Sequence, residues 1–256
     1  MLIDTHAHLQ VRDYDADRKE VIARAIEADV RYVINASFDL PSSQQAVKLA
    51  EENENIYAAV GVHPHDARTF DGKVLDALLE LAEHPKVVAI GEIGLDYYRN
   101  LSPRPVQKTV FEMQIDLARE AGLPVIIHNR DAHEDILEIL RRHPGQFRGV
   151  MHCFSGDQQF ADNCIQMGLC VSFAGPVTYP NARQLREVVA HIQMDKFFLE
   201  TDCPYLAPQF KRGKRNEPSY MKAVARKVAE IRHITLPEIA RITTENAGRL
   251  FEIATS

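Results

Sequence analysis

Histidine and acidic residues follow short apolar segments at several places along the chain. The first segment ends in His6-Ala7-His8. Side chains two residues apart on a strand point to the same side, so both imidazoles could reach one cation. Residues of the same kind stand at the ends of later apolar segments, and they are Glu92, His128, His152 and Asp202. Because imidazole and carboxylate groups are common ligands of divalent metals, these six residues predict a metal centre.

Glu92 and Asp202 are the predicted catalytic residues of this centre. The two oxygens of a carboxylate can bridge two cations, so we expect Glu92 to bridge a two-metal site, with His128 and His152 serving the second ion. Asp202 ends the last apolar segment, where it could contact both a metal and the attacking water, as a general base must. Glu200 and Asp96 are expected to support ligands by hydrogen bonding.

The metal itself is predicted only by class. Four imidazoles favour Zn, Mn, Fe, Co or Ni over a site built of oxygen ligands alone, although a nuclease could still use Mg or Mn. We therefore predict two divalent ions (Zn, Mn or Mg) and leave their identity open.

A group of basic residues follows the last apolar segment. Lys211, Arg212, Lys214 and Arg215 fall within five positions of one another. A solvated charged loop is the alternative, but a metal site beside it favours neutralisation of phosphates, which makes binding salt-dependent.

Other candidate substrate contacts are weaker. His63 and Arg130 follow strand ends and could hydrogen-bond a phosphate oxygen. Tyr205 and Phe154 could stack on a base, or could simply pack against their neighbours.

Short apolar runs of strand length alternate with amphipathic helical stretches from one end of the chain to the other. The expected strands are residues 2–6, 31–36, 56–62, 87–92, 124–128, 149–153, 169–173 and 197–201. The expected helices are residues 14–28, 42–52, 72–83, 106–121, 132–142, 158–166, 182–191, 219–232 and 237–251. Eight strand–helix units predict an α/β fold with a closed (β/α)8 barrel, as a single domain over residues 1–256. An open doubly wound sheet is the alternative, and no phosphate-binding fingerprint supports it. Residues 202–218 are expected to form a loop over the barrel mouth.

Composition limits the function classes. Hydrophobic residues make up 45% and charged residues 26% of the chain, as in ordinary globular proteins. The formal net charge of -6 gives no general attraction for nucleic acid, so binding of a polyanion requires a local basic patch. The four cysteines show no CxxC spacing, so we expect free thiols in a cytoplasmic protein. We expect no signal peptide and no membrane span, and no obligate protein partner is evident.

At the ligand positions the chain resembles the TatD family of metal-dependent deoxyribonucleases, within the amidohydrolase superfamily. The matching segments are IDTHAH (3–8), GVHP (61–64), GEIGLDY (91–97), PVIIH (124–128), HCFSG (152–156), LETDCPY (199–205), RGKRNEP (212–218) and ENAGRLF (245–251). The resemblance covers essentially the whole chain, with no departure at a ligand position. It implies that one ion is held by His6, His8, Glu92 and Asp202. It implies that Glu92, His128 and His152 hold the other.

These observations predict a metal-dependent hydrolase, foremost a deoxyribonuclease that releases nucleotides from strand ends with a water activated by two metals. The alternative keeps the site but changes the bond to another ester or amide, such as that of a D-aminoacyl-tRNA. The basic loop favours DNA or another phosphodiester, because a small neutral amide does not need it. A non-catalytic metal scaffold is disfavoured by Asp202, and a redox enzyme by the lack of a dinucleotide fingerprint.

Overall fold

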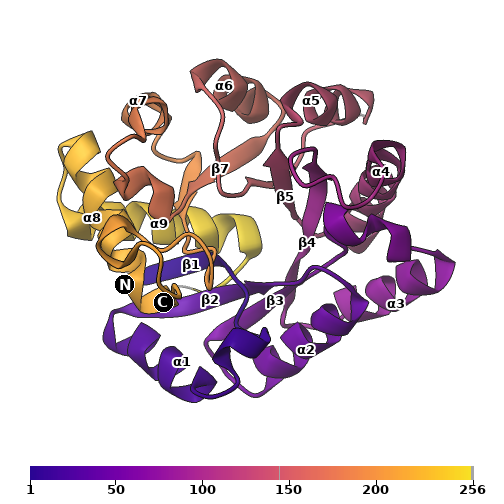
Figure 1. Cartoon of the computed structure of the whole chain (residues 1–256), viewed down its shortest axis with the longest axis horizontal. Helices are drawn as coiled ribbons and strands as arrows, with labels where there is room; N and C mark the ends of the chain where they lie inside the picture. Colours follow the sequence, from indigo (N-terminus) through magenta and orange to yellow (C-terminus); the bar gives the residue numbers. More distant parts are fainter. Residues whose placement is uncertain (144, 255–256) are drawn as a thin grey trace.

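Strands and helices alternate along the chain as expected, and the strands close into a barrel (Figure 1). The computed structural model describes residues 1–143 and 145–254. In this part of the chain the strands form one eight-stranded parallel sheet in the order β1 to β8, which confirms the (β/α)8 fold. The strands are β1 (Leu2–Ala7), β2 (Val30–Ala36), β3 (Ile56–Val60), β4 (Val87–Asp96), β5 (Val125–Arg130), β6 (Gly149–Met151), β7 (Leu169–Phe173) and β8 (Phe197–Leu199).

A ring of helices surrounds the strands (Figure 1). The α-helices are α1 (Arg18–Glu27), α2 (Leu40–Glu51), α3 (Gly72–Ala82), α4 (Arg104–Ala121), α5 (His133–Arg142), α6 (Gln158–Gln166), α7 (Arg183–His191), α8 (Met221–Arg232) and α9 (Leu236–Phe251). Short 3-10 helices are η1 (Arg12–Tyr14), η2 (Pro64–Thr69), η3 (Gly175–Thr178), η4 (Gln209–Lys211) and η5 (Pro218–Tyr220). None of the helices in the described residues is long and apolar enough to cross a membrane.

The barrel closes between β1 and the segment that follows β8. The amide of Asp202 donates to the carbonyl of His6 at 2.9 Å, and the amide of His8 donates to the carbonyl of Cys203 at 2.8 Å. A parallel bridge joins Ala7 and Cys203. This seam places the carboxylate that follows the last strand beside the two histidines that end the first.

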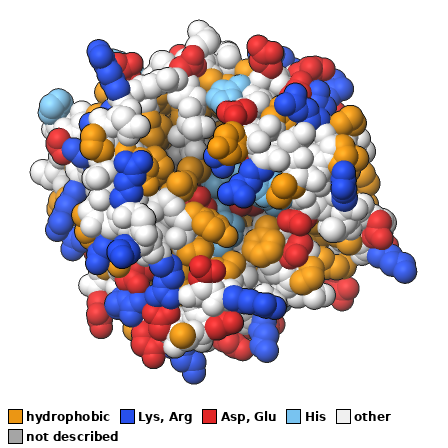
Figure 2. Space-filling view, viewed as in Figure 1, with side chains coloured by type: hydrophobic (Ala, Val, Ile, Leu, Met, Phe, Trp, Pro, Cys, Tyr) orange, Lys and Arg blue, Asp and Glu red, His pale blue; other side chains and the backbone are white. Residues whose placement is uncertain are grey.

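The interior of the barrel is filled by one cluster of apolar side chains that draws on all eight strands. Its members include Ile3, Ile126 and Phe198, and the cluster is completed by Phe251 and Ile253 near the end of the chain. In Figure 1 helix α9 lies behind the strands, and Figure 2 shows histidines on the face toward the viewer. Helix α9 therefore closes the end of the barrel opposite the histidines.

Only β7 has the expected bounds, and three of the other differences bear on the site. Strand β4 continues to Asp96, four residues beyond the expected end, whereas β6 and β8 end at Met151 and Leu199. His152 and Asp202 consequently lie just past their strands, in positions where the backbone is free to turn. The backbone does turn there, because Asp202 (φ 55°) and Cys153 (φ 44°), the residue after His152, adopt left-handed conformations.

Gly94 allows β4 to continue past Glu92. Its φ of 136° lies in a region that disfavours side chains, and a Cβ there would stand 2.0 Å from the carbonyl oxygen of His128. We expect Gly94→Ala to lower the free energy of unfolding by about 3 kcal/mol or more, measured by urea denaturation. Gly72→Ala is the control, because an added Cβ at Gly72 meets nothing within 4 Å. Equal stability of the two variants would contradict this account of β4.

Candidate metal centre

Glu92 lies at the centre of the histidine cluster, and its two oxygens face different histidines. Oε1 lies 2.7 Å from Nδ1 of His128 and 2.8 Å from Nε2 of His152. Oε2 lies 3.3 Å from Nε2 of His6 and 3.6 Å from Nε2 of His8. Each oxygen can therefore serve a separate ion, as a bridging carboxylate requires.

Asp202 completes the group around His6 and His8. Its Oδ1 lies 3.7 Å from Nε2 of His6 and 3.4 Å from Nε2 of His8. The ligand atoms of His6, His152 and Asp202 all lie within 4.8 Å of one another, as do those of His6, His8 and Glu92. The cluster thus contains all six residues that the sequence nominated as ligands.

Hydrogen bonds outside the cluster orient two of the imidazoles. Nδ1 of His8 lies 2.9 Å from the carbonyl oxygen of Ala36, and Nε2 of His128 lies 3.1 Å from Oδ2 of Asp96. Each of these nitrogens carries the proton in a neutral ring, since its partner can only accept. The opposite nitrogen then directs a lone pair toward an oxygen of Glu92. Lone pairs that face one another need a cation between them, so this donor set fits divalent metal ions.

The two central carboxylates are ionised despite their burial. Burial raises the pKa of Glu92, but its electrostatic interactions with His152 and His63 and its hydrogen bonds with His128 and His152 outweigh burial and hold the pKa well below its ordinary value. Burial likewise raises the pKa of Asp202, and its hydrogen bond with His8 helps to bring the pKa below the ordinary value. Two buried negative charges need positive charge beside them, and divalent cations held by this cluster would supply it.

Buried polar residues behind the cluster hold its members in place. Glu200 accepts hydrogen bonds from the amide of Cys153 at 2.6 Å and from the hydroxyl of Ser172 at 2.5 Å, and its Oε1 lies 3.5 Å from Nδ1 of His152. Asp96 contacts His128 as described. Glu200 and Asp96 therefore lie beside His152 and His128, where they can orient these imidazoles.

Asp4 is a supporting residue that sequence reasoning did not single out. It accepts hydrogen bonds from the amide of Thr201 at 2.9 Å and from the Thr201 hydroxyl at 2.6 Å, directly before Asp202. Full burial raises the pKa of Asp4 to about 7. Its position two residues before His6 was visible in the sequence, but nothing local indicated the long-range contact with Thr201.

His63 lies inside the histidine cluster, closer to Glu92 than a residue that only contacts the substrate would need to be. It is 7% exposed, and its Nε2 lies 3.4 Å from Oε1 of Glu92. Its ligand atom groups with those of Glu92 and His128 within 4.8 Å. Nε2 of its neighbour His65 lies 2.9 Å from Oδ2 of Asp96, an interaction missed from the sequence. His63 and His65 are two residues apart, like His6 and His8, and this spacing could have indicated that both belong to the cluster.

The mouth of the barrel is a hollow with histidines at its base, surrounded by cationic and apolar side chains (Figure 2). Tyr205 is 57% exposed, and its ring centroid lies 5.9 Å from that of His8. The guanidinium of Arg130 lies 4.0 Å from the ring centroid of Tyr98, and that of Arg212 lies 4.5 Å from the ring centroid of Tyr179. Lys214 is exposed. Three of the predicted contacts, Tyr205, Arg130 and Arg212, thus stand beside aromatic rings.

Arg215 has a different environment from the one expected of a phosphate contact. Its guanidinium donates to both carboxylate oxygens of Asp17, at 2.7 and 2.8 Å, and to the carbonyl oxygen of Asp13 at 2.7 Å. It also lies 4.7 Å from the ring centroid of Tyr14. Because these groups take up three of its five N–H donors and pair its charge, Arg215 anchors the loop after β8 to the start of α1, and we do not assign it to phosphate binding.

We expect Arg215→Ala to lower the midpoint of thermal unfolding by at most a few degrees, because the ion pair is partly exposed. The salt dependence of binding to a single-stranded oligonucleotide should be the same in this variant as in the unchanged protein. A weaker salt dependence in this variant would instead restore Arg215 to the phosphate contacts.

Phe154 packs rather than stacking on a substrate. It is 3% exposed, and its ring lies parallel to that of Phe160 with the centroids 5.7 Å apart. The apolar core uses this side chain, so the packing alternative for Phe154 is the correct one.

Comparison with known proteins assigns the chain to a family. The family model described as TatD related DNase matches residues 3–252. An uncharacterised metal-dependent hydrolase of Bacillus subtilis, YabD, is 50% identical, over 99% of this chain and 100% of its own length. The 3'-5' ssDNA/RNA exonuclease TatD of Pectobacterium parmentieri is 36% identical, over 99% of this chain and 100% of its own length. The crystal structure of YJJV, a TatD homologue of Escherichia coli, superimposes with a TM-score of 0.93 at 32% identity, covering 99% of this chain and 98% of that one. The histidine-rich barrel mouth and these full-length matches together place the chain in the TatD-related DNase family of metal-dependent hydrolases.

Proposed function

We propose that the protein hydrolyses phosphodiester bonds of single-stranded nucleic acid, DNA foremost, and releases nucleotides from a strand end. The observation that carries the proposal is Glu92, whose two oxygens face separate groups of histidines at the base of an open mouth. The exonuclease named among the relatives supports the choice of bond and of substrate.

The proposed ligands fall into two sets that share Glu92. His6, His8 and Asp202 would hold one ion, and His128 and His152 the other. Two divalent ions bound there would supply Lewis-acid activation of the attacking water and neutralise charge on the phosphate. Nitrogen-rich ligation favours Zn or Mn, and Mg remains a candidate for the working ion.

Asp202 is the proposed general base. It is ionised at neutral pH because its pKa lies below the ordinary value, so it can accept a proton from water. Its backbone is fixed by the hydrogen bond to His6 that closes the barrel. Proton transfer would therefore occur at the seam between the first and last strands, beside the scissile bond.

The rim supplies the proposed contacts to the rest of the substrate. Arg212 and Lys214 would neutralise backbone phosphates on the loop after β8. Exposed Tyr205 could stack on a base, and Arg130 could contact a phosphate from its place over Tyr98. His63 stays a candidate for a phosphate oxygen, although its place among the ligands equally fits a role in holding Glu92.

Release of nucleotides from labelled single-stranded DNA tests the proposal. Protein stripped with a chelator should be inactive, and adding back Mn, Zn or Mg should restore release that weakens as salt rises. Duplex DNA and single-stranded RNA should be assayed beside it. If no cation restores release from any nucleic acid, the proposal fails, and a D-aminoacyl ester would be the next substrate to assay on the same preparation.

A cytoplasmic location remains part of the proposal. The four cysteines are free, as expected in a reducing compartment.

A further inference from the structure

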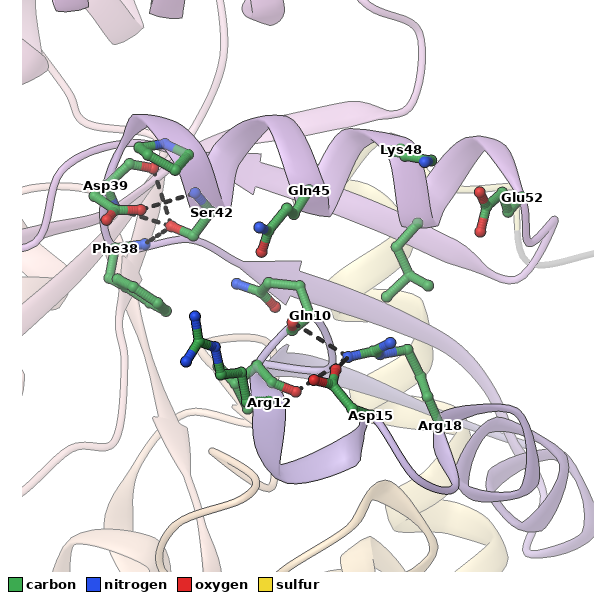
Figure 3. A pocket seen from close by; sticks show the side chains of 13 residues that line it. Gln10, Arg12, Asp15, Arg18, Phe38, Asp39, Ser42, Gln45, Lys48 and Glu52 are labelled. Atoms are coloured by element: carbon green, nitrogen blue, oxygen red, sulfur yellow. Dashed lines mark hydrogen bonds and ion pairs between the residues drawn. The ribbon is translucent and has the colours of Figure 1, made fainter.

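A polar groove lies between the segment after β1 and helix α2 (Figure 3). It encloses about 650 Å³, and its lining includes Gln10 and Arg12 on one side and Gln45 and Lys48 on the other. Helix α2 has 12 residues, so the groove can follow it for roughly 18 Å. An elongated groove of this kind suits an extended chain better than a compact ligand.

The groove begins beside the metal centre. Phe38 lines its inner end, and the Phe38 ring centroid lies 6.3 Å from that of His8. The backbone of Phe38 is held on both sides, since its carbonyl accepts from the amide of His63 at 2.9 Å and its amide donates to Ser42 at 3.0 Å. A molecule that leaves the mouth past His8 therefore meets this aromatic ring, on a fixed backbone, first.

Two free cations line the groove, Arg12 toward its inner end and Lys48 farther out along α2, and together they favour an anion. Arg12 and Lys48 are exposed, and neither side chain has a hydrogen bond or ion pair to the residues that the structure describes. Two nearby carboxylates are already engaged: Asp15 accepts from Arg18 at 2.6 Å, and Asp39 caps helix α2 through the amide of Ser42 at 2.8 Å. Glu52 adds a negative charge at the far end of α2, one turn beyond Lys48.

Gln10 supplies a second, independent observation. It is 8% exposed, and its Nε2 donates to the carbonyl of Ala36 at 2.8 Å, but its buried Oε1 has no partner among the described residues. Figure 3 shows Gln45 extending from α2 toward Gln10 and the guanidinium of Arg12 extending toward Phe38. A buried acceptor without a donor is costly, so a ligand that brings an N–H group is favoured.

We propose that this groove holds the nucleotides of the single-stranded substrate that adjoin the bond at the metal centre, on the part of the strand that stays bound after cleavage. Phe38 contacts the first of these bases, Gln10 accepts a hydrogen bond from a base amino group, and Arg12 and Lys48 neutralise the phosphates. A nucleotide carries a phosphate for Arg12 and Lys48, and its base can supply a ring for Phe38 and an N–H donor for Gln10. The inference rests on the proposed nuclease function.

The test compares kcat/KM for nucleotide release from a dinucleotide and from a dodecamer of the same base composition, with metal restored. A dinucleotide leaves most of the groove empty, whereas a dodecamer fills it. The unchanged protein should prefer the dodecamer, and Arg12→Ala/Lys48→Ala should lose about tenfold on the dodecamer relative to the dinucleotide at low salt. Losing two phosphate contacts should also reduce the slope of log kcat/KM against log salt by about 1.4.

The matched control is Lys73→Ala/Arg226→Ala, which removes the same charge from exposed positions on α3 and α8. It should keep both the length preference and the salt slope of the unchanged protein. The inference would be overturned if the unchanged protein did not prefer the dodecamer, or if Arg12→Ala/Lys48→Ala kept that preference in full. Either result would leave the nuclease function intact. Failure of the unchanged protein to cleave either oligonucleotide would instead remove the nuclease function and this inference with it.

Discussion

Glu92→Gln is expected to lower kcat/KM for nucleotide release by at least about a thousandfold, or ~4 kcal/mol of transition-state stabilisation. The amide keeps the size of the side chain but replaces one oxygen by an NH2 group. That group would face either His128 and His152 or His6 and His8, so one half of the cluster would lose its shared ligand. The loss of negative charge would also weaken binding of both cations.

Steady-state kinetics and metal analysis of the dialysed variant check this expectation together. The variant should hold fewer metal ions per chain and show an unchanged circular dichroism spectrum. Glu83→Gln is the matched control, because Glu83 is exposed at the end of α3 and should leave both quantities unchanged. A Glu92→Gln protein with more than a tenth of the original activity would rule out a bridging role for this carboxylate.

Asp202→Asn is expected to lower kcat by about a thousandfold with a smaller effect on KM, because a general base typically contributes between a hundredfold and ten-thousandfold. Asparagine cannot accept the proton, yet its oxygen can still face His6 and His8 at the distances that Asp202 Oδ1 now has. Metal content should therefore fall less than in the Glu92 variant.

Asp202→Glu tests whether the carboxylate itself or its position matters for activity. It keeps the carboxylate and should recover part of the activity that Asp202→Asn loses. Asp76→Asn, at an exposed position on α3, controls for the change in net charge. If Asp202→Asn binds metal and keeps full activity, another group must accept the proton.

The barrel and the ligand cluster followed from local patterns in the sequence. Strand-length apolar runs alternate with helical stretches, and parallel strands must then present their carboxyl ends at one rim. Residues at the ends of different runs, such as His6, Glu92 and His128, consequently meet even though they are far apart in the chain. Their types alone indicated the chemistry.

Features that depend on long-range packing could not be predicted. Arg215 pairs with Asp17 across 198 positions, and no local pattern distinguishes it from Arg212 and Lys214 beside it. The burial of Phe154 depends on where α6 places Phe160. The extension of β4 to Asp96 depends on the unusual backbone of Gly94, which a glycine permits but does not require.

Titration of metal into the chelated protein tests the central claim, that two ions bridged by Glu92 act together on a nucleic-acid strand. Nucleotide release from a single-stranded oligonucleotide would be followed while Mn or Zn is added to protein at a concentration well above the dissociation constant. The account predicts little activity at one equivalent per chain and full activity at two. Full activity at one equivalent, or activity that persists in the presence of chelator, would contradict it.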